Sequence, residues 1–235
     1  MRTAILIDGG YFLKRFPACY PGRDRHDAQA VARTAFELAL SHLKEVFGRR
    51  DLGTETTIHR DLYRIFFYDC PPLQKRAHRP VTRKSVDFSK SDEAIFRLKL
   101  HSELRKTRKV ALRLGHLSEQ SEWNLKPGIL KDLLGGAKKF TDLTDDDFIY
   151  DARQKGVDMR IGIDIANLAF RGLVDQIVLV AGDADFVPAA KLARREGIDF
   201  VLDPLWREIH DSLSEHVDGV RSTCPRPPAR TENRR

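Results

Sequence analysis

The sequence predicts an α/β fold in which helices flank a parallel sheet. In the C-terminal third, short apolar runs alternate with segments whose apolar residues recur at helical spacing. Such alternation implies crossover connections between parallel strands. At the N-terminus, the apolar run over residues 3–7 stops at Asp8-Gly9-Gly10, which is typical of a strand that is buried on both faces and ends at a turn. Both ends of the chain therefore indicate the same sheet.

The first third of the chain is expected to hold two strands and a helix. Residues 3–7 form the first strand, and a loop leads from it to a helix over about residues 27–47. Apolar residues recur at helical spacing in this helix, and Gly48 ends the pattern. Residues 62–68 are rich in aromatic and branched side chains, and two prolines follow Cys70, so this segment is predicted to be the second strand.

The middle of the chain has a different composition. Residues 75–109 contain twelve Lys or Arg against four Asp or Glu, and this excess of eight accounts for the whole net charge of +7. We expect a helix over residues 92–109, a strand over 110–114 and an irregular stretch over 115–147. About residues 73–150 are thus interpreted as an insertion-rich, basic part of the domain.

The C-terminal third alternates more clearly. The periodicity predicts three helices and two strands, in the order helix 158–170, strand 176–180, helix 186–195, strand 198–202 and helix 207–217. The domain is expected to span residues 1–220. A flexible basic tail, rich in Pro and Arg, is expected over residues 221–235.

The composition predicts a globular, cytoplasmic domain that binds a polyanion. The chain has 235 residues, 41% of them apolar, and a formal net charge of +7, so nucleic acid is the leading partner class. Its three cysteines, Cys19, Cys70 and Cys224, show no CxxC spacing, which argues against a disulfide framework or a zinc ribbon. We see no signal-peptide pattern and no apolar run long enough for a membrane helix.

Several aspartates are expected at one edge of the sheet. Asp8 follows the first strand, while Asp183 and Asp185 follow the strand over 176–180. Ligands of open parallel sheets bind at the carboxyl ends of the strands. Taken singly, Asp8 is explained as a turn residue and Asp185 as the N-cap of the helix that contains Pro188. Together, converging carboxylates repel one another unless a divalent cation such as Mg²⁺ or Mn²⁺ neutralises them.

Two aspartates of the helix over 158–170 are further candidates. Asp158 lies where a loop turns into this helix, so it is either a metal-site residue or an N-cap. Asp164 follows six positions later, at roughly −120° around a helix, and is less suited to the same ion.

Three sequence blocks resemble the signature blocks of NYN domains, which belong to the PIN-like nuclease superfamily and include a bacterial LabA-like branch. They are Ile5–Gly10, Lys155–Asp158 and Ala181–Phe186, and the similarity spans roughly Thr3 to Val217. The resemblance implies a Rossmann-like, PIN-like sheet and a (ribo)nuclease, expected to be an endonuclease, that uses Mg²⁺ or Mn²⁺. Carried over by position, the catalytic and metal-binding residues would be Asp8, Asp158, Asp183 and Asp185, with Asp164 a weaker metal candidate.

One position departs from the family pattern. Many NYN sequences place an Asn shortly after the first Asp, whereas this chain has Tyr11 and Phe12 there. We expect this difference to affect how the substrate is positioned in the site.

The basic stretch supplies candidates for nucleic-acid binding, with a solvated loop as the ordinary explanation for each residue. Phe88 and Phe96 offer little aromatic interleaving, and Asp145-Asp146-Asp147 is interpreted as a solvated loop or helix start, not a second metal site. The candidates are Lys75, Arg76, Arg79, Arg83 and Lys84.

Other functions fit less well. A haloacid-dehalogenase-like phosphatase needs a second Asp two residues after Asp8, where Gly10 stands, and a dinucleotide-binding turn needs a further glycine. The main alternative is a catalytically inactive NYN-type regulatory or RNA-binding module. RNA is favoured over DNA only through the resemblance, and a homodimer is compatible with the sequence.

Overall fold

The structure is a computed structural model that describes residues 1–47, 56–118, 122–152 and 154–228. Its centre is a six-stranded sheet in which every pairing is parallel, so the predicted fold class is confirmed. In spatial order the strands are β14 (Gly219–Val220), β13 (Asp199–Asp203), β12 (Gln176–Val180), β1 (Arg2–Asp8), β4 (Asp61–Asp69) and β7 (Val110–Leu114).

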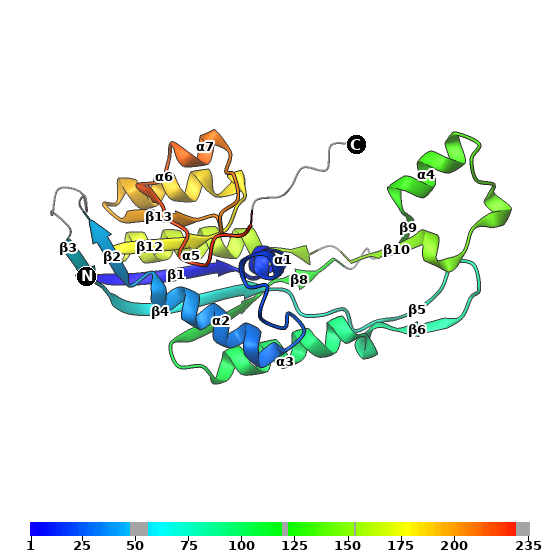
Figure 1. The fold of residues 1–235 in the computed structure, drawn as a ribbon, viewed down its shortest axis with the longest axis horizontal. Coiled ribbons are helices and arrows are strands. Elements are labelled where there is room, and N and C mark those ends of the chain that lie inside the picture. The colour runs from blue at the N-terminus through cyan, green and yellow to red at the C-terminus, as the bar shows by residue number, and fades with distance from the viewer. Residues whose placement is uncertain (48–55, 119–121, 153, 229–235) are drawn as a thin grey trace.

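Strand β1 is central and buried on both faces, as its unbroken apolar run predicts. Successive side chains of a strand point to opposite faces. Ala4 and Leu6 accordingly pack in one hydrophobic cluster, and Ile5 and Ile7 in another. Helices α5 (Val157–Phe170) and α6 (Val187–Arg195) contribute to the first cluster, and the second receives residues of α1 (Gly9–Cys19), α2 (Ala28–Ser41) and α3 (Asp92–Lys106). The two helical layers are visible in Figure 1.

Helix α1 fills a segment that was expected to be a loop. It begins directly after β1, and its side chains Phe12, Phe16 and Cys19, spaced by four and three residues, are buried. The preceding apolar strand masks this periodicity, because strand and helix follow each other without a polar spacer.

Two other helices are shorter than predicted. Helix α2 ends at Ser41, and residues expected to extend it form β2 (Lys44–Phe47), which pairs antiparallel with β3 (Thr56–His59). The expected C-terminal signal at Gly48 lies outside the described residues. The last predicted helix is reduced to the single turn α7 (Asp211–Ser214). Branched and aromatic residues after Ser41 favour a strand once a partner is available.

Between β4 and α5 the chain forms an arm, which we define as residues 73–91 and 122–152. It projects beyond the ends of β1 and β12 where these strands meet α1 and the aspartates (Figure 1). The insertion-rich part predicted over about residues 73–150, including the stretch over 115–147 that was expected to be irregular, contains short elements. They are β5 (Arg76–His78) with β6 (Ser85–Asp87), β9 (Glu122–Leu125) with β10 (Phe148–Asp151), helix α4 (Pro127–Leu134), and the 3-10 turns Phe88–Lys90, Phe140–Asp142 and Asp145–Asp147.

At the base of the arm, β8 (His116–Leu117) pairs antiparallel with β11 (Gln154–Lys155). Within the described residues, no helix has the length and apolarity needed to cross a membrane.

Candidate functional site

The carboxyl edge of the sheet begins at Asp8, the last residue of β1. Its side chain caps α1, because Oδ1 accepts a hydrogen bond from the backbone N–H of Tyr11 at 3.1 Å. Burial, helped by the nearby charges of Asp158 and Asp69, raises the pKa of Asp8 to about 6 against the opposing effect of the hydrogen bond from Tyr11. A carboxylate at this position is therefore costly to ionise without a compensating cation.

Asp183 and Asp185 lie after β12, the strand that pairs with β1. Asp183, not Asp185, acts as a cap: it accepts a hydrogen bond from the backbone N–H of Asp185 at 3.1 Å and opens the 3-10 turn Ala184–Phe186. Helix α6 follows, with Pro188 in its first turn as expected. The N-cap explanation of Asp185 is thus wrong, and its carboxylate is not used as a cap.

Asp158 lies in the first turn of α5. The N-cap of this helix is Gly156, at a φ of 76°, so the N-cap explanation of Asp158 is also wrong. Burial raises the pKa of Asp158, and the charges of Asp183 and Asp185 raise it further. Asp158 is therefore electrostatically coupled both to Asp8 on one side and to the β12 pair on the other.

These four carboxylates form an uncompensated acidic edge. Over residues 1–47, 56–118, 122–152 and 154–228, none of them forms an ion pair with Lys, Arg or His. In the same ranges, no three His, Cys, Asp or Glu side chains stand close enough together to hold one metal ion. The carboxylates thus interact electrostatically, but they do not converge on one point where a metal ion could bind.

Asp164 has a different environment. One of its oxygens accepts hydrogen bonds from the hydroxyl of Tyr68 at 2.9 Å and from Arg113 Nε at 3.2 Å. Burial raises the pKa of Tyr68, and the adjacent Asp164 adds to this effect. Asp164 therefore ties α5 to the ends of β4 and β7, and an ion would have to displace these partners.

Asp69, which the sequence analysis missed, ends β4 next to Asp8. It is fully buried and bonded to His101 Nε2 at 2.8 Å, to Arg97 and to the backbone N–H of Cys70. Burial alone would raise its pKa, but the hydrogen bond with His101 and the charge of Arg97 hold the pKa of Asp69 below its usual range. Its position directly before Cys70-Pro71 is the sequence signal that marks it as a strand-end carboxylate.

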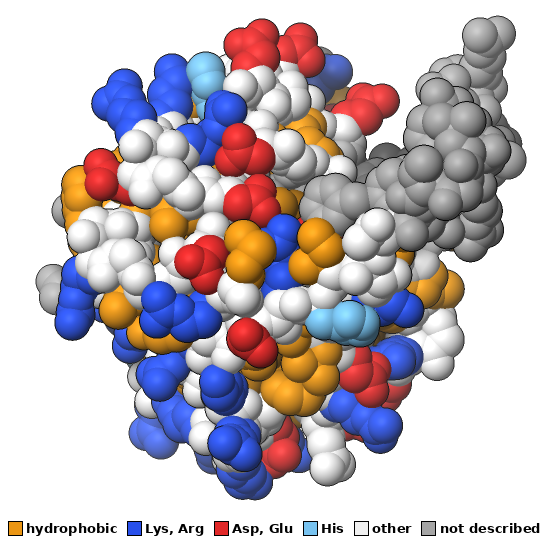
Figure 2. Space-filling model, turned by 90° about the vertical axis from the view of Figure 1, so that its left-hand side faces the viewer, with side chains coloured by type: hydrophobic (Ala, Val, Ile, Leu, Met, Phe, Trp, Pro, Cys, Tyr) orange, Lys and Arg blue, Asp and Glu red, His pale blue; other side chains and the backbone are white. Residues whose placement is uncertain are grey.

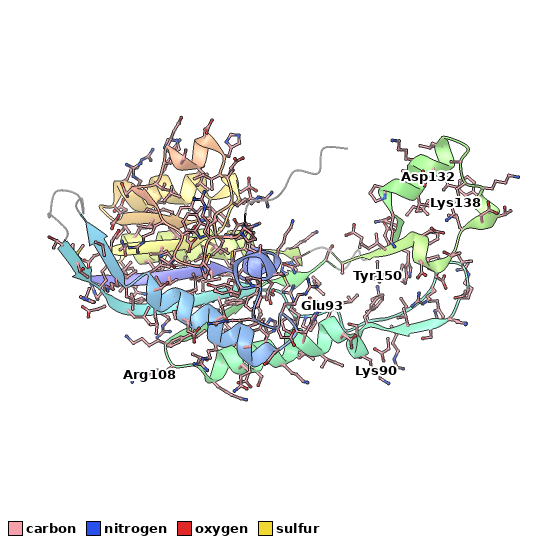
Figure 3. The ribbon with its side chains drawn as sticks, in the orientation of Figure 1. Lys90, Glu93, Arg108, Asp132, Lys138 and Tyr150 are labelled. Carbon is pink, nitrogen blue, oxygen red and sulfur yellow. The ribbon has the colours of Figure 1, made fainter. Side chains whose placement is uncertain are left out.

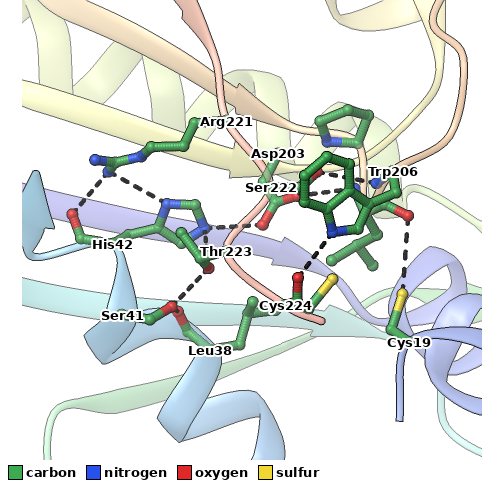
Figure 4. Close-up of polar contacts among 12 residues, drawn as sticks. Cys19, Leu38, Ser41, His42, Asp203, Trp206, Arg221, Ser222, Thr223 and Cys224 are labelled. Carbon is green, nitrogen blue, oxygen red and sulfur yellow. Dashed lines mark hydrogen bonds and ion pairs between the residues drawn. The ribbon is translucent and has the colours of Figure 1, made fainter. Parts of the chain in front are cut away.

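A second buried pair closes the end of β13 (Figure 4). Asp203 is paired with His42 Nε2 at 2.9 Å and accepts hydrogen bonds from Leu205 N and Ser222 Oγ, both at 2.8 Å. With both oxygens engaged and no exposed surface, Asp203 serves the fold. Ser222 and Cys224 belong to the segment that was expected to be a flexible tail. The backbone carbonyl of Cys224 accepts a hydrogen bond from Trp206 Nε1 at 2.8 Å, so this segment begins packed on the domain. Residues 229–235 lie outside the described part.

The basic candidates lie on the arm. Arg76 belongs to β5 and pairs with Asp87 at 3.2 Å, while Arg83 and Lys84 are exposed near the turn between β5 and β6. Lys75 is exposed and Arg79 is half-buried.

The acidic triplet beside this ribbon forms a 3-10 turn. Asp147 is bonded to Lys138, and Asp145 accepts from the backbone of Val81 and Thr82. The triplet is thus a turn that leads into β10 and not the start of an α-helix, and Asp147 is buried.

Positive charge is not confined to the arm. Figure 2 shows Lys and Arg side chains spread over the face at the opposite, amino edge of the sheet. A shallow hollow of about 710 Å³ is lined there by Lys191, Arg194 and Arg195 at the end of α6 and by the acidic residues Asp199 and Asp218. The sequence suggested a single basic stretch because distant segments come together only in the fold.

Comparison with known proteins gives one family match. The model of the NYN domain family matches residues 97–219, more than half of the chain, and this segment includes Asp158, Asp183 and Asp185 but not Asp8. No curated protein matches the chain.

Two solved structures have distant likeness. The chain is 14% identical to a protein of unknown function from Vibrio parahaemolyticus, with a TM-score of 0.47 over 94% of this chain and 92% of the other. A structure described as "Structural Basis for the Mechanism and Regulation of Sir2 Enzymes" is 11% identical, with a TM-score of 0.34 over 94% and 86% of the two chains. At these values neither likeness carries an argument.

Proposed function

Since the chain belongs to the NYN domain family, within the PIN-like nuclease superfamily, we propose that it is a metal-dependent nuclease that hydrolyses phosphodiester bonds, most favourably in RNA. The observation that carries the proposal is the uncompensated acidic edge formed by Asp8, Asp158, Asp183 and Asp185. Internal cleavage and membership of the LabA-like branch are parts of the same proposal.

The donor set fits a hard divalent cation. Carboxylate oxygens are the ligands that Mg²⁺ and Mn²⁺ prefer, and a bound cation would remove the repulsion that raises the pKa of Asp8 and Asp158. Because three carboxylates do not converge in the described part of the chain, metal binding requires the side chains of this edge to rotate inward. Asp183 and Asp185 lie in a short turn after β12, where such rotation is least hindered.

Each residue would have a distinct part in the reaction. Asp8, held by its capping bond to α1, would fix the cation against the centre of the sheet, while Asp158, Asp183 and Asp185 would complete the ligand set. A divalent ion bound there would lower the pKa of a water molecule and offset charge on the phosphate. His101 and Arg97 lower the pKa of Asp69, so this carboxyl group is negatively charged at neutral pH. Its charge raises the pKa of Asp8 and thereby favours a cation beside Asp8.

The substrate class follows from charge and position. The arm projects past the acidic edge, and the basic residues near β5 and β6 could follow a phosphate backbone that leads to this edge (Figure 1). The residues proposed for this contact are Lys75, Arg76, Arg79, Arg83 and Lys84.

The test is cleavage of end-labelled single-stranded RNA, matched DNA and hairpin RNA by the purified chain in EDTA, Mg²⁺ or Mn²⁺. Asp8→Asn and Asp183→Asn are the site variants, and Asp61→Asn, an exposed aspartate at the start of β4, is the matched control. Metal-dependent cleavage that the site variants lose and the control keeps supports the proposal. Equal cleavage by all variants indicates a contaminating nuclease and contradicts it.

A second function is favoured by two observations. Tyr11 stands where many members of the family carry an Asn, and the carboxylates do not converge in the described ranges. Both features are compatible with a catalytically inactive module that binds RNA for regulation. RNA binding without cleavage under any of the metal conditions would favour this alternative over the nuclease.

A further inference from the structure

Two of the three cysteines meet in the core, although they come from opposite ends of the chain. Cys19 is the last residue of α1, and Cys224 follows β14. Both belong to the hydrophobic cluster that contains Ile5 and Ile7, and they are 1% and 5% exposed. A hydrogen bond joins their thiol groups, and both are free thiols in the structure (Figure 4).

The residues after β13 hold both cysteines in place. The thiol of Cys19 donates to the backbone carbonyl of Leu205 at 3.8 Å, and Arg15 Nη2 donates to the same carbonyl at 2.7 Å. The next residue, Trp206, donates from Nε1 to the carbonyl of Cys224 at 2.8 Å. The loop after β13 therefore keeps the end of α1 and the C-terminal segment against each other.

The third cysteine is separated from this pair by the sheet. Cys70 packs in the hydrophobic cluster that contains Leu6, on the opposite face of β1. Its thiol donates to the backbone carbonyl of His116 at 3.5 Å, and burial raises the pKa of Cys70. Cys70 is thus an unreactive thiol that contacts neither Cys19 nor Cys224.

The two paired thiols differ in acidity. The hydrogen bond from Cys224 lowers the pKa of Cys19, and the positive charge of Arg15, one helical turn earlier on α1, lowers it further against the effect of burial. The same hydrogen bond raises the pKa of Cys224, and burial raises it further. The thiolate is the nucleophilic form of cysteine, so Cys19 is the attacking residue and Cys224 is its partner in a second step.

We propose that Cys19 and Cys224 are an oxidation site at which a hydroperoxide forms a reversible disulfide. The thiolate of Cys19 attacks one peroxide oxygen, so that an S–O bond forms, the O–O bond breaks, and the second oxygen takes up a proton and leaves as water or an alcohol. The thiol of Cys224 then attacks the sulfenic acid at Cys19. An S–S bond replaces the S–O bond, and the hydroxyl leaves as water with the proton of Cys224. The two thiols lose two electrons in total, and the peroxide gains them.

The disulfide would fasten the C-terminal segment to the end of α1. Because the two residues are so far apart in the chain, the cross-link restricts the unfolded chain and should make the oxidised protein more stable than the reduced one. The site lies on the sheet and not on the arm, whose far end Figure 3 marks with Asp132 and Lys138. The proposal requires no reaction at the acidic edge, so it does not depend on the proposed nuclease activity.

Peptide mapping of the full chain after treatment with hydrogen peroxide tests the proposal. The remaining thiols are alkylated under denaturing conditions, and trypsin then releases Cys19 within residues 16–23 and Cys224 within residues 222–230. These two peptides should be recovered joined within one chain and should separate on reduction, while Cys70 stays alkylated. Calorimetry should show that the oxidised protein melts several degrees above the reduced protein.

Variants separate the roles of the two cysteines. Cys224→Ser should stop at the sulfenic acid of Cys19, which dimedone labels, whereas Cys19→Ser should leave Cys224 unlabelled. Cys70→Ala is the matched control and should form the disulfide at the wild-type rate. Arg15→Gln should slow the oxidation severalfold, and Lys14→Gln, which removes an exposed charge from the same helix, should not. Thermal melting confirms that each variant is folded.

Several results would overturn the proposal. One is a folded wild-type chain in which Cys19 and Cys224 both stay alkylatable after peroxide treatment. Another is a disulfide that joins two chains or includes Cys70. Equal slowing by Arg15→Gln and Lys14→Gln, or dimedone labelling of Cys224 in Cys19→Ser, would contradict the assignment of Cys19 as the attacking thiolate.

Discussion

The ring of Tyr11 lies against the backbone of Gly182: a Cβ atom at residue 182 would stand 2.6 Å from Cε2 and 2.8 Å from Cζ of Tyr11. Tyr11 follows β1 and Gly182 follows β12, so this contact joins the ends of two paired strands. The hydroxyl of Tyr11 also donates to the carbonyl of Pro204, beyond β13, at 2.5 Å. One side chain thereby spans three strand ends and lies beside both Asp8 and Asp183.

Gly182→Ala is expected to destabilise the fold by about 1–3 kcal/mol, because the added methyl group overlaps the ring of Tyr11. Tyr11→Ala should also destabilise it, through lost packing. The double variant should cost less than the sum of the two, since the small side chain at residue 11 accommodates the new methyl group. Urea unfolding of all four proteins measures the coupling, and strictly additive values would contradict the contact.

The stability of the metal-free protein should depend on the ionisation of Asp8. Its pKa is raised to about 6, so its contribution is fully present below the unfolded value of 3.8 and is lost as the pH rises through about 6. In EDTA, Asp8→Asn should therefore stabilise the protein by about 2 kcal/mol more at about pH 8 than at about pH 4. Chemical denaturation at both pH values provides the measurement. An effect of equal size at the two would be inconsistent with a raised pKa.

His101→Ala is expected to destabilise the protein by about 3 kcal/mol, because it leaves the buried Asp69 carboxylate with one fewer partner. The pKa of Asp69 is lowered in the fold, so its contribution is present above the unfolded pKa and is lost as the pH falls through the folded one. The free energy of unfolding of the variant should therefore fall less steeply than that of the wild type as the pH is lowered. His26→Ala, at an exposed position, is the control and should change neither quantity.

Shortening the chain tests the contacts that Ser222 and Cys224 make with the domain. Removal of residues 229–235 gives the reference chain for the melting temperature. Removal from Ser222 onward should lower it by several degrees, since Asp203 and Trp206 then lose their hydrogen bonds to Ser222 and Cys224. Differential scanning calorimetry makes the comparison, and equal melting temperatures would show that these contacts do not stabilise the domain.

The sequence was sufficient to predict the sheet but not the full site. β12 has the predicted bounds, because an apolar run between polar turns leaves one interpretation. The placement of Asp8 and Asp183 after neighbouring strands is also consistent with the sequence, since β1 and β12 both lead into aspartate-containing turns. Asp69 was missed because its importance arises from His101, 32 residues away, and such pairing is set by packing.

The short elements of the arm could not be predicted from the sequence. Its strands are three or four residues long and bury no hydrophobic side chain in the described ranges, so they show no recognisable period-2 pattern. Helix α4 was missed because it has only eight residues, which is too short for a helical period to be recognised in the sequence.

The position of β1 has a consequence for folding during synthesis. Thr3 pairs with Gln176, so the first strand to leave the ribosome must wait for one of its two neighbours until most of the chain has been made. At roughly 5–20 residues per second, this delay lasts roughly ten to thirty seconds, during which only β4 is available as a partner. The strand that carries Asp8 is thus an aggregation-prone edge in the nascent chain, and the protein should depend on chaperones more than its size suggests.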